Sequence, residues 1–412
     1  MNQAQTASSL TAGVGGGSFK PADRLSSVQE YYFSRKLKEV AQLNAEGKDI
    51  ISLAIGSPDM PPSERTINVL CEEARKANGH GYQLTIGTPE LRTAMARFYQ
   101  RWYGVTLDPK TEIQPLIGSK EGILHVTLAF VNPGDQVLVP NPGYPTYTAL
   151  SRLLGAEVVN YDLTESNDWQ PDFEQLEQLD LSRVKLMWTN YPHMPTGAPA
   201  RRETYERLVA FAQRHSIIIV NDNPYSFIRP AGNSPLLSIL QIPGAKDCCI
   251  EFNSMSKSHN MPGWRVGMLS TNAQFVQWIL KVKTNIDSGT FRALQLAAAD
   301  ALANSTEEWH REMNTQTYAR RRVIAEEIMQ TLGCTFDPAQ TGMFLWGRIP
   351  DSYADVEDLT ERVLHEARVF ITPGFIFGSN GNRYIRISLC AKEEQIREAL
   401  RRIQTLPPAP PL

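Results

Sequence analysis

The segment from Cys248 to Gly267, CCIEFNSMSKSHNMPGWRVG, places a single lysine just after an apolar run. Residues 248–252 predict a buried strand, because strands that helices cover on both faces are apolar along their whole length. Lys257 follows this strand, and a lysine whose charge is disfavoured by burial can attack an aldehyde as the free amine. The segment therefore predicts the nucleophile of a Schiff-base site, with a surface loop lysine as the alternative.

Apolar runs of the same kind alternate with helical patterns between residues 60 and 285. They include 136–139 (QVLV), 184–188 (VKLMW) and 217–220 (IIIV). This alternation predicts an α/β fold with a mostly parallel sheet that is covered by helices. Ligands bind at the carboxyl ends of such strands, so the residues that follow these runs form the candidate site.

Both ends of the chain predict a smaller α+β domain beside this sheet. An amphipathic helix at 28–46 and a strand at 50–54 precede the proline-rich segment 58–62, where the pattern breaks. Long helices over 289–331 precede a rhythm of strand, helix and strand that extends to residue 389. We expect the following units: a flexible arm, 1–20; a large domain, 60–285; a small domain, 21–59 with 286–405; and a disordered tail, 406–412.

Composition and charge argue against several classes of partner. The 412 residues include 41 basic and 44 acidic ones, and a net charge of -3 argues against nucleic acid or an anionic membrane. Five cysteines without paired spacing argue against a disulfide framework or a zinc site and predict a reducing compartment. The sequence predicts neither an export signal nor a membrane span. We therefore expect a cytoplasmic protein that acts on small molecules without a metal ion.

Hydroxyl and cationic side chains near the lysine could bind a phosphate. Ser254 and Ser256 are hydroxyl donors, and Arg265 offers a planar guanidinium that matches phosphate geometry. Ser119 and Lys120 begin a predicted helix, and the free amides of a helix N-terminus attract anions. An ordinary capped helix would have the same sequence. The prediction that Ser119 and Lys120 bind a phosphate therefore depends on the other candidate residues.

Asp222, Tyr225 and Tyr144 could surround a flat, protonated ring. Asp222 ends an apolar run, where a buried carboxylate needs a cationic partner such as a protonated pyridine nitrogen. Tyr225 is close in sequence and could reach a phenolic oxygen of the same ring. Tyr144 follows the strand at 136–139 and could stack on the face of the ring. An aspartate that caps a turn and an ordinary core tyrosine are the alternatives for Asp222 and Tyr144.

Several motifs follow one another along the chain: NYPHMPTG at residues 190–197, Asp222 with Tyr225, Ser254 to Lys257 with Arg265, and Arg386. Together they resemble the class I/II aminotransferases, the fold-type I enzymes that use pyridoxal 5'-phosphate (PLP). The resemblance extends over about residues 28–405. It implies a mostly parallel sheet of the seven-stranded type in the large, PLP-binding domain.

The resemblance implies roles for residues around the cofactor. Lys257 resembles the lysine that binds PLP and later moves a proton between substrate and cofactor. Asp222 would keep the pyridine nitrogen protonated, and Tyr225 would donate to the phenolic oxygen. Ser119, Lys120, Ser254 and Arg265 are similar to the family's phosphate-binding residues, the first two through backbone amides. The remaining predicted cofactor-binding residues are Tyr144, Asn190 and Ser256.

Three more residues resemble the family's substrate-binding and interface positions. Arg386 is similar to the arginine that binds the α-carboxylate of the substrate, with a surface ion pair as the alternative. Gly56 resembles the glycine whose backbone approaches the same carboxylate. Tyr82 resembles a tyrosine that reaches the phosphate of the neighbouring subunit, which implies a homodimer.

Met194 departs from the family pattern Asn-Pro-Thr-Gly, in which the asparagine donates a hydrogen bond to the phenolic oxygen of the cofactor. A thioether cannot donate. We predict that the phenolate oxygen is more basic without this donor, so that the linkage between Lys257 and PLP holds its proton to higher pH. Asn190 and His193 are the residues that could supply the missing donor.

The resemblance implies transamination between a 2-amino acid and a 2-oxo acid, by a ping-pong mechanism through pyridoxamine phosphate. A PLP-dependent β/γ-elimination lyase or synthase is the alternative on the same fold. A non-catalytic regulator would need a helix-turn-helix domain, for which residues 1–27 are too short. Residues 283–289 resemble the substrate-pocket segment of relatives that act on alanine or diaminopimelate. Arg292 could bind a distal carboxylate or simply face outward.

Overall fold

The computed structural model describes residues 19–27, 32–229 and 236–407. Residues 1–18 of the predicted arm, residues 28–31 of the predicted first helix and residues 408–412 of the predicted tail lie outside this part. Within it, no helix combines the length and the apolar character that crossing a membrane requires.

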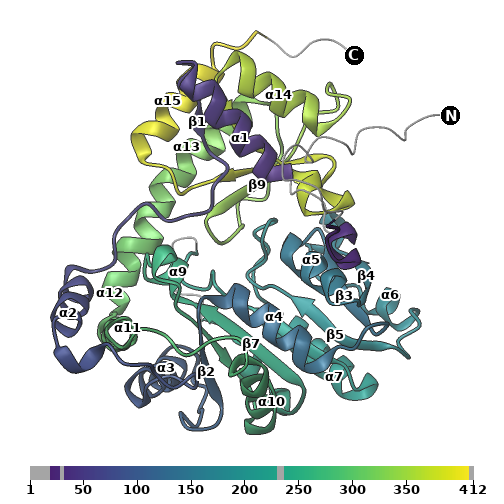
Figure 1. Cartoon of the computed structure of the whole chain (residues 1–412). Helices are drawn as coiled ribbons and strands as arrows, with labels where there is room; N and C mark the ends of the chain where they lie inside the picture. The colour runs from purple at the N-terminus through teal and green to yellow at the C-terminus, as the bar shows by residue number, and fades with distance from the viewer. Residues whose placement is uncertain (1–18, 28–31, 230–235, 408–412) are drawn as a thin grey trace.

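A seven-stranded sheet runs through the lower part of the molecule in Figure 1. Its strand order is β2-β8-β7-β6-β5-β3-β4, and neighbouring strands are parallel except for β8, which is antiparallel to β2 and β7. The predicted α/β fold with a mostly parallel sheet is therefore confirmed. The strands are β2 (Ile113–Leu116), β3 (Gln136–Asn141), β4 (Glu157–Asp162), β5 (Val184–Thr189), β6 (Ile218–Asp222), β7 (Cys249–Ser254) and β8 (Gly267–Ser270).

Helices cover both faces of this sheet, which explains why inner strands such as β3 and β7 are buried along nearly their whole length, whereas the edge strand β4 is not. Val137 and Val139 of β3 pack into one hydrophobic cluster and Leu138 into another, because successive side chains of a strand alternate. The first cluster includes α4 and α10, and the second includes α3 and α7. Burial of each such side chain contributes about 2 kcal/mol. These helices are α3 (Pro89–Tyr103), α4 (Ser119–Phe130), α7 (Arg202–His215) and α10 (Ala273–Lys283).

Local sequence signals set the ends of these helices. The hydroxyl of Thr88 accepts the N–H of Leu91, and Pro89 occupies the first helical position of α3. Gly104 ends the same helix in the left-handed conformation, at φ 65°. Shorter helices complete this part of the chain: α2 (Glu64–Ala74), α5 (Pro145–Leu153), α6 (Phe173–Glu177), α8 (Ala245–Cys248) and α9 (Met255–Ser258).

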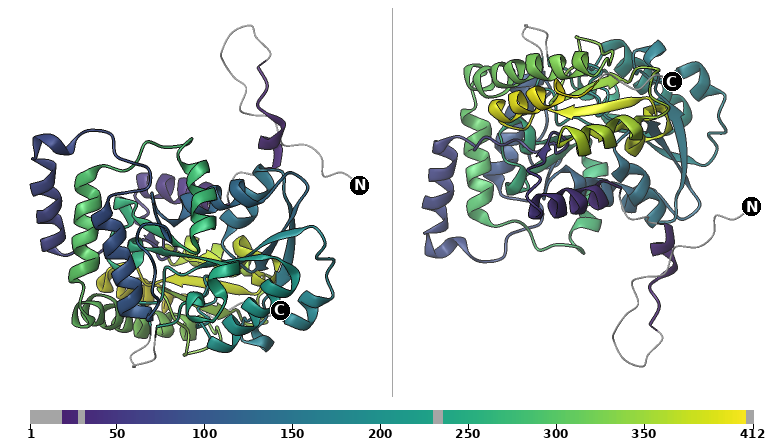
Figure 2. Two further views of the ribbon diagram at one scale, coloured as in Figure 1. Left: turned by 90° about the horizontal axis from the view of Figure 1, so that it is seen from below. Right: turned by 90° about the horizontal axis from the view of Figure 1, so that it is seen from above.

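Segments from both ends of the chain meet in a second region, at the top of Figure 1 and in front of the sheet when seen from above in Figure 2. Strand β1 pairs in parallel with β10, and β11, β12 and β9 form an antiparallel sheet. The domain boundaries themselves stay a prediction. The elements are α1 (Tyr32–Ala45), β1 (Ile51–Ser52), β9 (Phe344–Arg348), α14 (Val356–Glu366), β10 (Val369–Phe370), β11 (Thr372–Pro373), β12 (Tyr384–Ser388) and α15 (Glu393–Ile403).

The helices predicted over residues 289–331 are interrupted in the structure. They are α11 (Arg292–Asn304), α12 (Glu307–His310) and α13 (Thr317–Thr331), with a π-helical segment, Arg311–Gln316, before α13. The break after α11 has a local cause, because the hydroxyl of Thr306 accepts the N–H of Trp309, 3.1 Å away, and so caps a new helix.

Candidate active site

A cavity of about 350 Å³ lies where the carboxyl ends of β6 and β7 face the second region. All the predicted site residues line it except Tyr82. Parallel strands place their carboxyl ends at one edge of the sheet, so residues far apart in the sequence meet there. The predicted residues that meet in the cavity are Gly56, Ser119, Lys120, Tyr144, Asn190, Asp222, Tyr225, Ser254, Ser256, Lys257, Arg265 and Arg386.

Lys257 belongs to the short helix α9, which begins where the side chain of Ser254 accepts the N–H of Ser256, 3.2 Å away. Its amine donates a hydrogen bond to the carbonyl of Gly56. Burial lowers the pKa of Lys257, and the positive charges of Arg386 and Arg265 act in the same direction. The lysine is therefore a buried amine that loses its proton more readily than an exposed lysine, as a nucleophile requires.

Asp222 is the last residue of β6 and lines the cavity. Its Oδ2 accepts a hydrogen bond from the hydroxyl of Tyr147, 3.0 Å away. Its Oδ1 is buried without a hydrogen-bond partner among the described residues. Burial raises the pKa of Asp222 to about 6, against the hydrogen bond from Tyr147 and the charge of Lys257, which lower it. A cation beside Oδ1 would satisfy this carboxylate.

The first turn of α4 and Arg265 form a close-packed cationic pocket. Gly118 precedes the helix at φ 76°, and a Cβ there would overlap the guanidinium of Arg265. Nη1 of Arg265 donates to the carbonyl of Pro262 at 3.0 Å and lies 3.5 Å from the hydroxyl of Ser256. Helix amides and a guanidinium at one point are suited to a phosphate group.

Arg386 enters the cavity from β12, on the side opposite the sheet. Its guanidinium lies 4.0 Å from the ring centre of Phe344 and 4.6 Å from that of Phe377. Its Nη2 donates to the carbonyl of Ala54 at 2.9 Å. A Cβ at Gly56 would overlap the ring of Phe344, so only glycine fits the segment beside the guanidinium. The aromatic contacts and the carbonyl hold the arginine in a fixed orientation.

Met194 lies against this arginine, with its sulfur 3.3 Å from Nη1 of Arg386. The side chain of Asn190 also lines the cavity, but its Nδ2 donates to the carbonyl of Asp222 at 2.6 Å and its Oδ1 accepts the N–H of Met194 at 2.9 Å. His193 is buried outside the cavity lining, with its Nδ1 2.8 Å from the hydroxyl of Thr196. The effect of Met194 on the cofactor stays a prediction.

Two residues considered in the sequence lie away from the cavity. Tyr82 is 95% exposed. Arg292 begins α11, with its guanidinium 3.6 Å from a carboxylate oxygen of Glu90. Residues 283–289 do not line the cavity of this chain either.

Sequence reasoning missed six residues that line the cavity: Ile55, Tyr147, Pro224, Pro262, Phe344 and Phe377. A signal existed for Tyr147, because it lies three residues after Tyr144 and so shares its face at the start of α5. The sequence gives no comparable signal for the apolar residues on other elements. A buried aromatic side chain has the same sequence pattern whether it packs in the core or lines a cavity.

The residues present fit PLP. The cavity offers a buried amine on Lys257 for the aldehyde, an unpaired carboxylate oxygen on Asp222 for a ring cation, and the cationic pocket at Arg265 for a phosphate. With Arg386 opposite, the fold and this arrangement define an enzyme that uses PLP to act on amino acids.

Comparisons with known proteins give the family. The sequence matches the family described as aminotransferase class I and II over residues 48–403. It is 41% identical over 384 residues to an LL-diaminopimelate aminotransferase of Dehalococcoides mccartyi, which covers 93% of this chain and 98% of that protein. It is 42% identical over 388 residues to an LL-diaminopimelate aminotransferase of Oleidesulfovibrio alaskensis, with coverage of 94% and 99%. The apo structure of BacF from Bacillus subtilis superimposes with a TM-score of 0.89 at 34% identity, over 94% of this chain and 98% of that one.

The chain therefore belongs to the class I and II aminotransferases. It is a PLP-dependent enzyme that catalyses transamination between a 2-amino acid and a 2-oxo acid. The predicted enzyme class and the predicted cofactor are confirmed.

Proposed function

We propose that this aminotransferase is a homodimer whose amino donor is LL-diaminopimelate, with the α-carboxylate of the donor bound to Arg386. The observation that carries the proposal is the fixed guanidinium of Arg386 in the same cavity as the amine of Lys257. A bidentate contact with Arg386 would fix the substrate's Cα relative to that amine. We also expect the enzyme to act in the cytoplasm.

The chain's own side chains have distinct tasks in this proposal. PLP, when bound, supplies an electron sink for the negative charge that develops at the substrate's Cα. Lys257 takes the proton from Cα and returns it, because its lowered pKa lets the amine act as a base. Asp222 holds a proton on the cofactor's ring nitrogen through its unpaired oxygen. Tyr225 would donate to the phenolic oxygen, and Tyr144 would pack on the ring.

The phosphate group would be held by one cluster of donors. The backbone amides of Ser119 and Lys120 face it from the helix N-terminus, and Arg265 supplies the opposing charge. The hydroxyls of Ser254 and Ser256 lie in the same cavity. This cluster fixes the position of the cofactor while the amino group moves between substrates.

Surface exposure supports the homodimer. Tyr82 and Leu84 are 95% and 77% exposed on a loop that ends next to α3. An exposed tyrosine beside an exposed leucine is unfavourable in water and is suited to a protein partner. In the proposed dimer Tyr82 reaches the phosphate in the cavity of the partner subunit.

The names of the similar proteins support LL-diaminopimelate as the donor, since two of them are LL-diaminopimelate aminotransferases at 41% and 42% identity. This donor carries an ammonium and a carboxylate at its distal end. The cavity lining includes the apolar side chains of Phe33, Ile55, Phe344 and Phe377, and the last two, together with Met194, contact Arg386. We therefore expect the partner subunit to supply the groups that bind the distal end.

The same apolar wall favours a second candidate donor, an amino acid with an aromatic or aliphatic side chain. Such a side chain needs no charged partner and would be stabilised by burial against the phenylalanine rings. In that case the cavity of one chain would be sufficient for recognition of the side chain.

A test with single donors separates the two candidates. The purified holoenzyme is mixed with LL-diaminopimelate, meso-diaminopimelate, phenylalanine or leucine, and the amine form of the cofactor is followed by absorbance. We expect conversion with LL-diaminopimelate at the highest kcat/KM, together with a 2-oxo product by mass spectrometry. Faster conversion with phenylalanine or leucine would replace the first candidate by the second. A 2-oxo acid and ammonia released in the absence of an acceptor would indicate elimination chemistry.

A further inference from the structure

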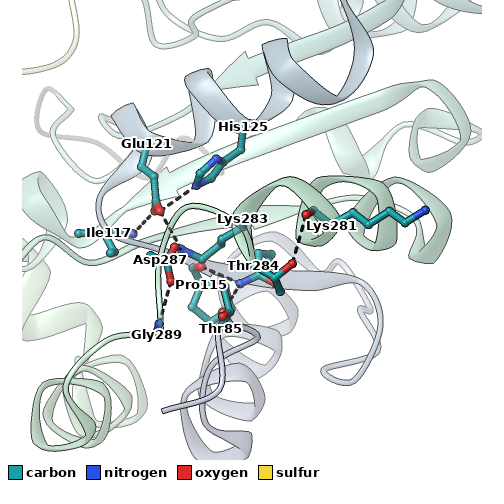
Figure 3. A network of polar contacts seen from close by, with 11 residues as sticks. Thr85, Pro115, Ile117, Glu121, His125, Lys281, Lys283, Thr284, Asp287 and Gly289 are labelled. Carbon is teal, nitrogen blue, oxygen red and sulfur yellow. Dashed lines mark hydrogen bonds and ion pairs between the residues drawn. The ribbon is translucent and has the colours of Figure 1, made fainter. Parts of the chain in front are cut away.

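A buried lysine, Lys283, lies between two carboxylates (Figure 3). Lys283, at the end of α10, is 2% exposed. Its amine donates to Oε1 of Glu121 at 2.7 Å and to Oδ2 of Asp287 at 2.6 Å. His125 contributes its Nε2, 2.8 Å from the same oxygen of Glu121. We call these four residues the Lys283 network. The lysine supplies the cation that the two carboxylates require.

The network reaches the phosphate-binding end of α4 through Glu121. This residue directly follows Ser119 and Lys120, which line the cavity. Its second oxygen, Oε2, accepts the N–H of Ile117 at 2.5 Å. The side chain of Glu121 therefore links the start of α4 to the residue that precedes Gly118. Burial alone would raise the pKa of Glu121, but hydrogen bonds from His125 and Lys283 lower it. The conformation of the phosphate-binding turn thus depends on a carboxylate that Lys283 keeps charged.

The network reaches the surface through Asp287. Its other oxygen, Oδ1, accepts the N–H of Gly289 at 2.8 Å. Gly289 has φ +81°, and a Cβ there would lie 2.5 Å from the carbonyl oxygen of Gln83, so the two loops are in close contact. Gln295 also links the two loops by hydrogen bonds. Its side chain accepts the N–H of Thr88 at 2.7 Å and donates to the carbonyl of Thr290 at 2.6 Å.

The two loops that are joined in this way, residues 81–88 and 284–291, carry exposed apolar side chains. Tyr82 and Leu84 are 95% and 77% exposed, and Ile286 and Phe291 are 49% and 43% exposed. A small cavity beneath the loops is lined by Leu84 and Thr290, by Lys283, and by Arg265 of the phosphate-binding pocket. The exposed surface, the lysine and the cofactor pocket are therefore contiguous.

We propose that Lys283 is a positioning residue that couples PLP binding to association with a second copy of this chain. The inference rests on the proposed homodimer. A partner subunit on the two loops would fix Asp287, and through Lys283 it would fix Glu121 and the first turn of α4 in the geometry that binds phosphate. A phosphate on α4 would in turn order the loops for the partner. Such coupling is reciprocal, so each event strengthens the other by the same factor.

The coupling is measured as the dimer dissociation constant of the full-length protein with and without PLP, by analytical ultracentrifugation. The PLP affinity of the apoenzyme is measured separately by fluorescence titration. For the wild type we expect PLP to strengthen the dimer at least about 10-fold. For Lys283→Met we expect weaker PLP binding and a strengthening of less than about 3-fold. Lys281→Met is the matched control, since Lys281 is an exposed lysine of the same helix, and it should behave as the wild type.

Two further variants separate coupling from general damage to the fold. Lys283→Arg keeps a cation and should restore part of the coupling. Asp287→Asn keeps the residue volume and changes only the loop side of the network. It should weaken the coupling while circular dichroism stays unchanged. If Lys283→Met fails to fold, the coupling is tested with Asp287→Asn alone.

The possible failures are distinguishable. A wild type that is monomeric with and without PLP would overturn the homodimer, before any variant is considered, and the coupling with it. A dimeric wild type whose strengthening by PLP persists in Lys283→Met or Asp287→Asn would overturn the coupling and leave the homodimer intact. Weaker PLP binding in Lys283→Met with unchanged coupling would also overturn it, because Lys283 would then support only the phosphate-binding turn.

Discussion

The cavity and the Lys283 network are two buried groups of charged side chains on either side of the first turn of α4. In the network, all the carboxylate oxygens of Glu121 and Asp287 accept hydrogen bonds. In the cavity, Oδ1 of Asp222 has no partner among the described residues. An unpaired buried oxygen costs free energy, so it marks a place where a ligand completes the structure. Carboxylates whose oxygens are all paired within the chain mark a place where the protein holds itself in position.

Glu251 is a third kind of buried acid, on the strand next to Asp222. Its oxygens accept from the hydroxyl of Ser238 at 2.7 Å, the N–H of Ile239 at 3.1 Å and the amide of Asn221 at 3.2 Å. These donors are all neutral. Burial raises the pKa of Glu251 to about 7, although the hydrogen bonds lower it. Neutral donors therefore do not keep the pKa of Glu251 low, whereas the charged amine of Lys283 helps to lower the pKa of Glu121.

Lys257→Ala should have the largest effect, because it removes the base and the covalent attachment of the cofactor together. We expect kcat to fall at least about 10⁴-fold. Borohydride treatment of the holoenzyme should no longer fix PLP to the chain, as measured by mass spectrometry. Lys246→Ala is the control, since Lys246 pairs with Glu112 outside the cavity at 2.8 Å. Retained covalent PLP in Lys257→Ala would place the nucleophile elsewhere.

Arg386→Met should weaken the recognition of every donor, because the α-carboxylate loses its charged partner. We expect kcat/KM to fall about 10³-fold, roughly 4 kcal/mol, with PLP affinity near the wild-type value. Arg383→Met is the control, since Arg383 directly precedes β12 and donates to the carbonyls of Pro350 and Tyr353 outside the cavity lining. A similar loss for amines that lack a carboxylate would show that Arg386 acts on the fold instead.

Glu251→Gln tests the buried acid that has neutral partners. The pKa of Glu251 is about 7 in the folded protein and 4.5 in an unfolded chain, so between these values the folded state binds more protons. The free energy of unfolding should therefore fall as pH rises from 4.5 to 7, by roughly 3 kcal/mol, and this slope should be absent in Glu251→Gln. Urea unfolding of the apoenzyme at several pH values measures it. Equal slopes for variant and wild type would contradict the prediction.

Tyr147→Phe removes the only hydrogen bond that the described residues donate to the carboxylate of Asp222. That hydrogen bond lowers the pKa of Asp222, so the variant should have a higher pKa and a larger protonated fraction. We expect PLP to bind about 10-fold more weakly at neutral pH, with the loss growing as pH falls towards 6. Tyr161→Phe is the control, since it removes a buried hydroxyl that donates to the carbonyl of Trp188. A pH-independent loss in Tyr147→Phe would contradict the role of Asp222.

Met194→Asn should have the smallest effect and tests the missing donor in the cavity. The asparagine would donate to the phenolic oxygen of PLP, so the linkage between Lys257 and PLP should lose its proton at lower pH, by about one pH unit. A spectrophotometric pH titration of both proteins measures this shift. An unchanged or higher midpoint in Met194→Asn would contradict the prediction, and a change in KM alone would point to the contact of Met194 with Arg386.

The sequence predicted the sheet and most of the cavity for a common physical reason. Apolar runs identify buried strands, and parallel strands end at one edge, so Asp222 and Ser254 at successive strand ends had to be neighbours. Several helices were predicted over residues 289–331, but the position of the break after α11 was not, because a single hydroxyl at Thr306 decides where one helix ends and another begins. Periodicity over a long window does not detect such a local hydrogen bond.

By itself the sequence determined the α/β fold, and it predicted a nucleophile at Lys257 and a cation-binding carboxylate at Asp222. These depend on local patterns and on the rule for strand ends. Only the tertiary structure decided that Tyr147 donates to Asp222, that Phe344 packs on Arg386, and that Lys283 joins Glu121 to Asp287. The reason is that these contacts form between elements whose relative packing leaves no period or motif along the chain.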